Sequence, residues 1–222
     1  MATTFKLIMN TYSNMREFNK AETFEKQADR LYRKALGDDI GIVEVVSFNN
    51  LVGDIAIKKG GLKALEKAAE VYSSSSKILH DIVGENGIDF ILSLLDIGDI
   101  HLEKKEYEQA LSFYTLASDK VTKTFGEDSI FHHRINSSLV ELYASKGDKT
   151  FKKCFELSMK NIEFAQKLYG EESLYCLSYY LSGISSAVQQ HEQGTPSQQL
   201  AEELLAKMMK VLESTGEIAN GN

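Results

Sequence analysis

The sequence contains very little proline and cysteine. Its 222 residues include one proline and two cysteines. Because proline interrupts helices, this scarcity leaves long stretches of chain free to be helical, and we expect an all-α protein. Cys154 and Cys176 do not have the spacing of a metal site. So few cysteines argue against a disulfide framework and favour a reducing compartment.

Excess positive charge and long apolar runs are also missing. The formal net charge is −7, whereas a surface for nucleic acid or anionic membrane needs clustered lysine and arginine. We therefore expect a basic protein partner and no nucleic acid. No window approaches the roughly 18 apolar residues of a membrane span, and residues 1–20 lack the apolar core of a signal peptide. These absences predict a soluble, cytoplasmic protein.

A short junction recurs along the chain. Each copy places an apolar residue, a glycine and an acidic residue in sequence, and the copies begin at Leu36, Val83, Phe125 and Tyr169. The four glycines are 47, 42 and 44 residues apart. Self-similarity at a period of roughly 20–50 residues indicates stacked repeats. Glycine can end a helix in the left-handed conformation, and the acidic residue suits the start of the next helix.

Small residues recur at fixed distances before these glycines. Sixteen residues before them stand Ala21, Ala68, Ala110 and Cys154, and nine before them stand Ala28, Ser75, Ala117 and Asn161. Tyr72 and Tyr114 stand twelve residues before their glycines. Small side chains let another helix pack closely while bulky ones fill the space beside them. Each segment is therefore expected to be the second helix of a helical hairpin.

Residues 97–117 resemble one hairpin of the tetratricopeptide repeat (TPR) family almost from end to end. They combine Gly98, a turn at 104–107, and then Ala110, Tyr114 and Ala117. The family's usual period is about 34 residues, and the longer spacing here resembles the subclass in kinesin light chains and nephrocystin. The resemblance implies a right-handed TPR α-solenoid of about five hairpins, or about ten helices, with a groove lined by the first helices.

The same template fits residues 1–217 as a single superhelical domain. The expected hairpins occupy about 3–36, 41–83, 88–125, 129–169 and 173–214. In the fifth, Thr195 is expected to be an N-cap and Pro196 the first residue of the second helix. Residues 214–217 echo the junction, and we expect residues 218–222 to be a frayed tail.

Acidic residues recur at the position that faces the groove in this family. Alignment on the junctions places there Asn10, Asp54, Asp99, Glu141 and Ser185. Asp96 and Glu103 share one helical face with Asp99. Two interpretations remain open: an ordinary solvated face, or an electronegative groove that selects a basic or amphipathic segment of a partner protein.

Two known TPR ligand types fit the sequence poorly. Kinesin-light-chain grooves read acidic cargo peptides with basic pockets, whereas this groove has the opposite charge. The carboxylate clamp of co-chaperone TPR domains matches at Lys6 and Asn10, but its later positions fall on Leu51, Leu92 and Asp96. A carboxylate in place of the clamp arginine would repel the ligand. A co-chaperone module is therefore kept only as the alternative function.

No residue pattern indicates an enzyme, a metal site or a cofactor. His132 and His133 are adjacent and point in different directions on a helix, so they cannot chelate a metal together, and we expect both at the surface. The acidic residues around His101 lie on one helix, whereas carboxylate metal sites need ligands from several facing helices. The sequence shows neither a phosphate-binding glycine loop nor a nucleophile elbow.

The last helix carries more apolar side chains than one packing face needs. Residues 201–212 include Leu204, Leu205, Met208, Met209 and Leu212. Self-association, a partner at this end, and burial within the fifth hairpin all remain open. The sequence thus predicts a non-catalytic TPR adaptor or scaffold that binds a protein segment in an acidic groove. Resemblance to kinesin light chains suggests a cytoskeletal or ciliary assembly.

Overall fold

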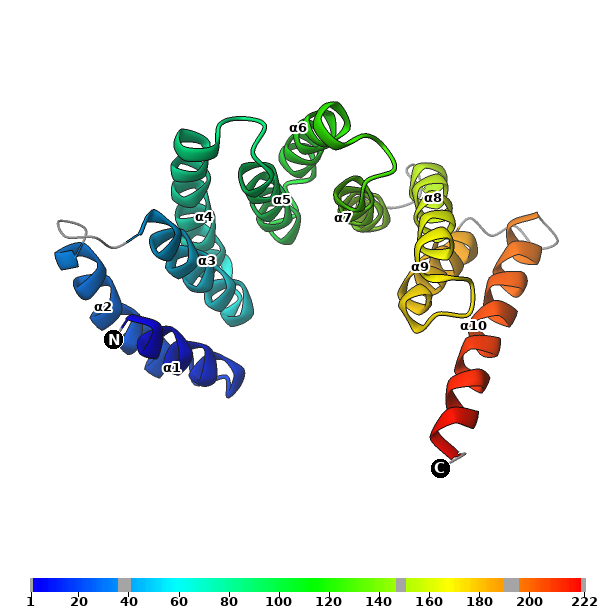
Figure 1. The fold of residues 1–222 in the computed structure, drawn as a ribbon, viewed down its shortest axis with the longest axis horizontal. Helices are drawn as coiled ribbons and strands as arrows, with labels where there is room; N and C mark the ends of the chain where they lie inside the picture. Colours follow the sequence, from blue (N-terminus) through cyan, green and yellow to red (C-terminus); the bar gives the residue numbers. More distant parts are fainter. Residues whose placement is uncertain (1, 36–40, 147–150, 190–195, 221–222) are drawn as a thin grey trace. The chain divides into compact units, whose positions relative to one another are not determined.

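The protein is built from helices. The structure, a computed structural model, describes residues 2–35, 41–146, 151–189 and 196–220, and no β-strand occurs among them. The helices, shown in Figure 1, are α1 (Ala2–Asn14), α2 (Phe18–Ala35), α3 (Ile42–Lys59), α4 (Leu62–Val83), α5 (Ile88–Glu103), α6 (Tyr107–Phe125), α7 (Ile130–Lys146), α8 (Phe151–Tyr169), η2 (Leu174–Cys176), α9 (Leu177–Gln189) and α10 (Pro196–Asn220). Among these described helices, none combines the length and apolarity that a membrane crossing requires.

The expected hairpins are present. α1 packs on α2, α3 on α4, α7 on α8, and α9 on α10, while side-chain contacts join α5 to α6. Further contacts between α4 and α5, and between α8 and α9, connect one hairpin to the next. We number the hairpins one to five in chain order. The all-α prediction and the division into helical hairpins are confirmed.

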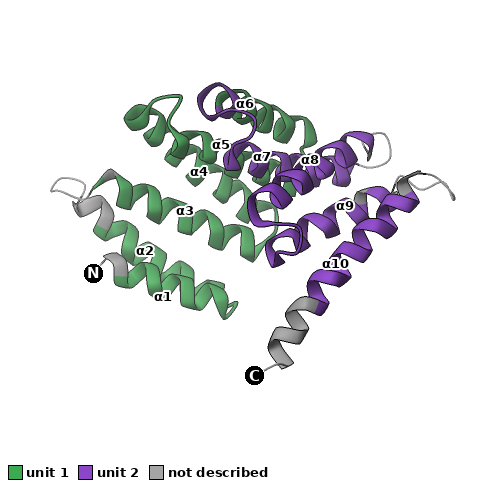
Figure 2. Ribbon diagram, turned by 45° about the vertical axis from the view of Figure 1, so that its right-hand side comes forward, with its two compact units in different colours: residues 1–120 green, residues 121–222 purple. Residues whose placement is uncertain are grey.

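The contacts group the chain into two compact units (Figure 2). Unit 1 is Met1–Lys120, with α1 to α5 and most of α6, and unit 2 is Val121–Asn222, with the end of α6 and the remaining helices. A single domain over residues 1–217 stays a prediction.

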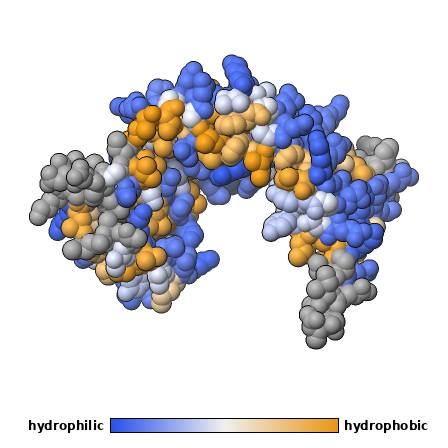
Figure 3. Space-filling model, in the orientation of Figure 1, coloured by the Kyte–Doolittle hydropathy of each residue, from blue (hydrophilic) through white to orange (hydrophobic). Residues whose placement is uncertain are grey.

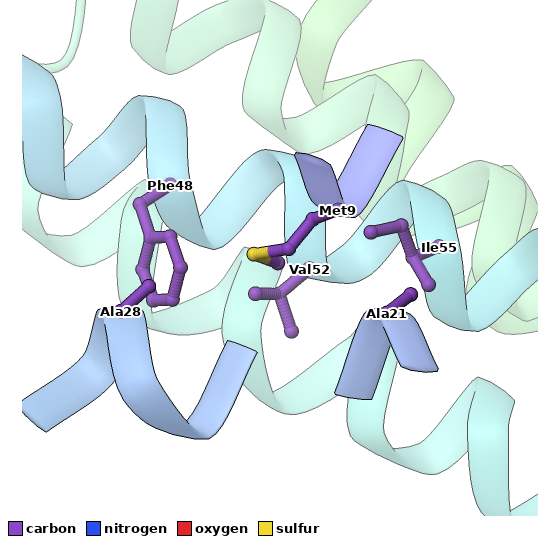
Figure 4. Packing of buried hydrophobic residues seen from close by; sticks show 6 residues of the cluster. All are labelled: Met9, Ala21, Ala28, Phe48, Val52 and Ile55. Atoms are coloured by element: carbon purple, nitrogen blue, oxygen red, sulfur yellow. The ribbon is translucent and has the colours of Figure 1, made fainter. Parts of the chain in front are cut away.

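The small residues before the junctions lie in the core, as expected. Figure 4 shows Ala21 and Ala28 of α2 beside Met9 of α1 and Phe48 and Val52 of α3. The short alanine side chains let the helices approach, and the larger side chains then fill the remaining space. Burying a side chain of the size of Val52 or Met9 stabilises the fold by roughly 1.5–3 kcal/mol.

Three junction glycines have the positive φ that was expected. The φ angles of Gly84, Gly126 and Gly170 are 74°, 84° and 85°. The ψ angle of Gly84 is 177°, so this residue does not adopt the left-handed helical conformation but an extended one that is essentially restricted to glycine. The chain therefore leaves α4 in an extended direction. Gly37 lies outside the described residues.

The fifth hairpin differs from expectation at its end. α10 begins at Pro196, as predicted, but it continues through 214–217 to Asn220, so neither the predicted end near residue 214 nor a tail frayed from residue 218 is observed. A single glycine inside a helix costs about 1 kcal/mol, which is too little to end the helix by itself. Thr195, the expected N-cap, lies outside the described residues.

Candidate functional site

Hairpins two and three contain the same contact between a tyrosine and an aspartate. Tyr72 Oη of α4 donates a hydrogen bond to Asp54 Oδ1 of α3 at 2.5 Å. Tyr114 Oη of α6 donates to Asp99 Oδ1 of α5 at 2.6 Å. Hydrogen bonds to a carboxylate are short and strong, so each contact holds the carboxylate in one orientation.

A glycine before each aspartate makes room for the tyrosine ring. A Cβ atom added to Gly53 would lie 2.3 Å from the Tyr72 ring, and one added to Gly98 would lie 2.5 Å from the Tyr114 ring. Only glycine lets the ring lie so close to the helix backbone. We call this arrangement the tyrosine clamp; its two copies are Gly53, Asp54 and Tyr72, and Gly98, Asp99 and Tyr114.

Acidic side chains from two helices converge on Tyr72. Burial, and next the hydrogen bond with Asp54, raise the pKa of the Tyr72 hydroxyl well above its usual range. The charges of Asp96 and Asp99 raise this pKa further, which places both carboxylates of α5 within electrostatic reach of the ring. The hydroxyl therefore stays protonated and remains a donor. We call Asp54, Asp96 and Asp99 the acidic cluster.

The other predicted groove residues are not among the charges that act on Tyr72. Asn10 on α1 and Glu103 on α5 are exposed, and Glu141 is exposed on α7 in unit 2. The structure thus brings together the three residues of the acidic cluster, and the longer groove across three hairpins stays a prediction. The sequence analysis missed the two tyrosines as partners. Their signal is a Gly-Asp pair in the first helix followed by a tyrosine twelve residues before the junction glycine.

A cavity of about 600 Å³ lies among α2, α3 and α4. Its wall includes Val52, Ile55 and Ala56, which are buried. Two ion pairs also line it: Lys59 lies 2.5 Å from Glu22, and Lys67 lies 2.7 Å from Glu25. Since these charges already neutralise each other, the cavity offers little to a charged ligand.

Hairpin four has no tyrosine clamp. Ser158 stands twelve residues before Gly170, where hairpins two and three carry the tyrosine, and Val140 precedes Glu141 where they carry glycine. Ser158 is buried and lines a cavity of about 250 Å³ together with Ser137, Asn161, Ser178, Tyr179 and Ser182. A space lined mainly by hydroxyl groups therefore lies beside the position of the missing ring.

The expectation that His132 and His133 lie at the surface is wrong. His133 is only 7% exposed and His132 is half-buried. The His133 ring stacks on Phe164 with their centroids 3.6 Å apart, and its Nδ1 lies 3.1 Å from Asn161 Oδ1. Burial lowers the pKa of His133 below its ordinary value. The α7–α8 packing explains the error, because it turns His133 towards Phe164 of α8.

The remaining titratable groups that the structure describes do not form a metal centre. Within the described residues, no three histidine, cysteine, aspartate or glutamate side chains are arranged to hold a metal ion. His101 stacks on Phe113, and its Nδ1 lies 2.6 Å from Glu106 Oε2. Cys154 and Cys176 are buried and form no disulfide with each other. Their positions favour structural over catalytic roles.

The apolar residues of α10 divide into two groups. Leu204 is 2% exposed in the core of hairpin five, and Met208 packs against that core. Leu205, Met209 and Leu212 are 45%, 48% and 45% exposed. Their spacing places them on one stripe of the helix, and Figure 3 shows hydrophobic side chains exposed where α9 and α10 lie. An interface at this end stays a prediction for the second group.

Comparisons with known proteins identify solved structures with a similar fold. No protein-family model matches the sequence, and no curated protein matches it. Among solved structures, BtubC (BKLC) from P. vanneervenii matches with a TM-score of 0.75 and 16% identity over 96% of this chain and 80% of that chain. A putative kinesin light chain with nearly identical TPR-like repeats, from Podosopora anserina, matches with a TM-score of 0.73 and 11% identity over 96% of this chain and 95% of that one.

A third match comes from a larger protein. A signal transduction ATPase with numerous domains and a tetratricopeptide repeat sensor, from Pyrococcus horikoshii, matches with a TM-score of 0.75 and 19% identity over 97% of this chain and 30% of that chain. Identities this low show the fold alone. The chain therefore has the TPR-like repeat fold, in agreement with the resemblance seen in its sequence.

Proposed function

We propose that the protein is a non-catalytic scaffold that binds a basic segment of a partner protein at the acidic cluster. The observation that carries this proposal is the tyrosine clamp, which orients Asp54 and Asp99 through buried rings. A carboxylate has about four acceptor positions, so it can accept from a lysine or arginine in addition to the tyrosine. Binding at groups that are already oriented loses less conformational entropy.

The negative charge of the acidic cluster favours a positively charged ligand. Asp54, Asp96 and Asp99 lie close enough for all three to act on one hydroxyl. Like charges held together repel each other, and a bound cation relieves that repulsion. An arginine could bind a carboxylate through two parallel hydrogen bonds, which a lysine cannot do.

The fold and the matching structures support this kind of function. Stacked helical repeats present an extended surface to other proteins. One matching structure is described as a putative kinesin light chain, which favours a cytoskeletal or ciliary assembly in the cytoplasm. The co-chaperone alternative is less favoured for two reasons. Asp96 stands where the carboxylate clamp of co-chaperones needs an arginine, and Lys6 Nζ, which matches the first lysine of that carboxylate clamp, already donates to Ser47 Oγ at 3.0 Å.

A peptide-binding experiment tests the proposal. The probe is a fluorescent (Arg-Gly)4 peptide at low salt, and the variant is Asp54→Asn/Asp99→Asn. We expect its affinity to fall about tenfold, since each close charge pair contributes about 0.5–1 kcal/mol. Glu66→Gln/Glu70→Gln on the exposed face of α4 is the matched control, because it removes the same charge elsewhere in unit 1. Equal loss in both variants would mean that only net charge attracts the peptide, and the proposal would fail.

A further inference from the structure

A cavity of about 290 Å³ lies in hairpin four, within unit 2. Its walls are formed by side chains of α7 and α8 and of the junction that precedes α7. The inner wall includes His133 and Phe164, whose rings are stacked. The cavity is separate from the acidic cluster, because every residue that lines it belongs to unit 2.

The buried His133 has a ring nitrogen without a partner. Among the described residues, nothing forms a hydrogen bond with its Nε2. A buried acceptor in this state destabilises the fold, because it has lost its hydrogen bonds to water without gaining another. A ligand that enters the cavity can recover this energy if it brings a donor.

The neighbouring hydrogen bonds show that Nε2 is an acceptor. Ser137 Oγ donates to the His133 carbonyl at 3.1 Å, so it accepts from Asn161 Nδ2, also at 3.1 Å. Asn161 therefore turns its Oδ1 towards His133 Nδ1, which must carry the proton. The lone pair is left on Nε2. Burial favours the neutral ring by lowering the pKa of His133.

Charged side chains of both signs line the same cavity as His133. Glu127, Asp128 and Glu163 contribute carboxylates, and Lys160 and Lys167 contribute ammonium groups. Within the part of the chain that the structure describes, none of these five side chains forms an ion pair. Polar groups that converge on a cavity without partners of their own are typical of a binding site.

We propose that this cavity binds a lysine or arginine side chain of a partner protein, with an acidic residue next to it in the partner sequence. An N–H group of the cation donates to His133 Nε2, and Asp128 in the cavity wall supplies the opposite charge. A ligand with only positive charge would meet Lys160 and Lys167, whereas one with only negative charge would meet three carboxylates. A basic residue followed by an acidic one offers an opposite charge to both the carboxylates and the lysines of the cavity.

Nuclear magnetic resonance of the His133 ring nitrogens tests this inference. The probe is the dipeptide acetyl-Arg-Glu-amide, and long-range ¹H–¹⁵N spectra report whether Nε2 accepts a hydrogen bond. We expect a saturable shift of the Nε2 signal. Acetyl-citrulline-Glu-amide, which keeps the N–H donors but not the charge, and acetyl-Arg-Gln-amide should each bind at least threefold more weakly.

Three variants show which residues are responsible for the binding. Asp128→Asn should weaken binding of acetyl-Arg-Glu-amide about fivefold, since one exposed charge contact contributes about 1 kcal/mol. Glu156→Gln, on an exposed position of α8, should leave the affinity unchanged. His133→Phe, which keeps a ring against Phe164, should abolish saturable binding in protein that is still helical by circular dichroism.

The inference is overturned if the Nε2 signal does not respond, if the citrulline peptide binds as well as the arginine peptide, or if Asp128→Asn binds like wild type. These outcomes do not depend on the acidic cluster, because Asp54→Asn/Asp99→Asn should leave the His133 shift unchanged. Failure here and failure of the proposed function can therefore be told apart.

Discussion

Hairpins three and four share the same helical hairpin structure but differ in how the space beside their helices is filled. In hairpin three, Gly98 and Tyr114 fill the space between the two helices and fix Asp99 at its edge. In hairpin four, Val140 and Ser158 take those positions. One cavity with a polar lining lies among α7, α8 and α9, and another is lined by α7, α8 and the junction before α7. The comparison teaches that the tyrosine ring needs a glycine on the facing helix, because a Cβ atom there would collide with the ring.

The largest expected effect comes from removing a clamp ring. Tyr114 is fully buried, so Tyr114→Ala should lower the free energy of unfolding by about 3–5 kcal/mol. Ser158→Ala, at the equivalent position of hairpin four, should lower it by about 1 kcal/mol. Urea denaturation followed by circular dichroism measures both. Similar losses at the two positions would show that the hairpins do not differ in the proposed way.

A smaller effect is expected from adding one methyl group beneath the ring. In an ordinary helix, Gly→Ala stabilises by about 1 kcal/mol. Gly98→Ala should instead lower the free energy of unfolding by about 1–3 kcal/mol, because its Cβ would collide with Tyr114. The same urea experiment decides the sign. In the background Tyr114→Leu, which removes the ring atoms at the collision, most of this loss should disappear.

The Tyr72 hydroxyl should make the free energy of unfolding depend on pH in the alkaline range. Because the folded protein raises the pKa of Tyr72, its contribution is present below the unfolded value of about 10 and is lost as pH rises above it. Tyr72→Phe should lower the free energy of unfolding by about 1–2 kcal/mol near neutral pH. Between pH 9 and 11, wild type should lose more stability than this variant. Parallel curves in thermal unfolding would contradict the prediction.

The smallest effect is expected at acidic pH in hairpin four. Because burial lowers the pKa of His133, the unfolded chain takes up a proton first as pH falls through about 6.5. The contribution of His133 is therefore present above that pH and is lost below it. His133→Phe should flatten this part of the stability curve. If wild type and variant respond equally between pH 7 and 5, His133 is not the group responsible.

Much of the fold could be predicted because its signals lie close together in the sequence. The junction glycines mark helix ends through backbone geometry, and residues such as Ala68 and Ala110 mark close helix packing. These features depend on local structure and on a repeated period. They gave the positions of the hairpins within a few residues, except at the end of α10, where one glycine proved too weak to stop the helix.

The site was less predictable because its contacts join residues from different helices. The acidic positions Asp54 and Asp99 could be found from the repeat alignment, but their hydrogen bonds with Tyr72 and Tyr114 depend on ring orientation. The burial of His133 depends on which side of α7 faces Phe164 of α8. Periodicity says that adjacent residues diverge, but it does not say which of them turns inward.

The burial of the two cysteines has a practical consequence for chemical labelling. Both thiols are buried, and burial raises the pKa of Cys176, so little of it is the reactive thiolate at neutral pH. A cysteine introduced on an exposed surface should therefore react with a maleimide before either native thiol does. Fluorophores or cross-linkers could be attached at chosen points while Cys154 and Cys176 are left in place.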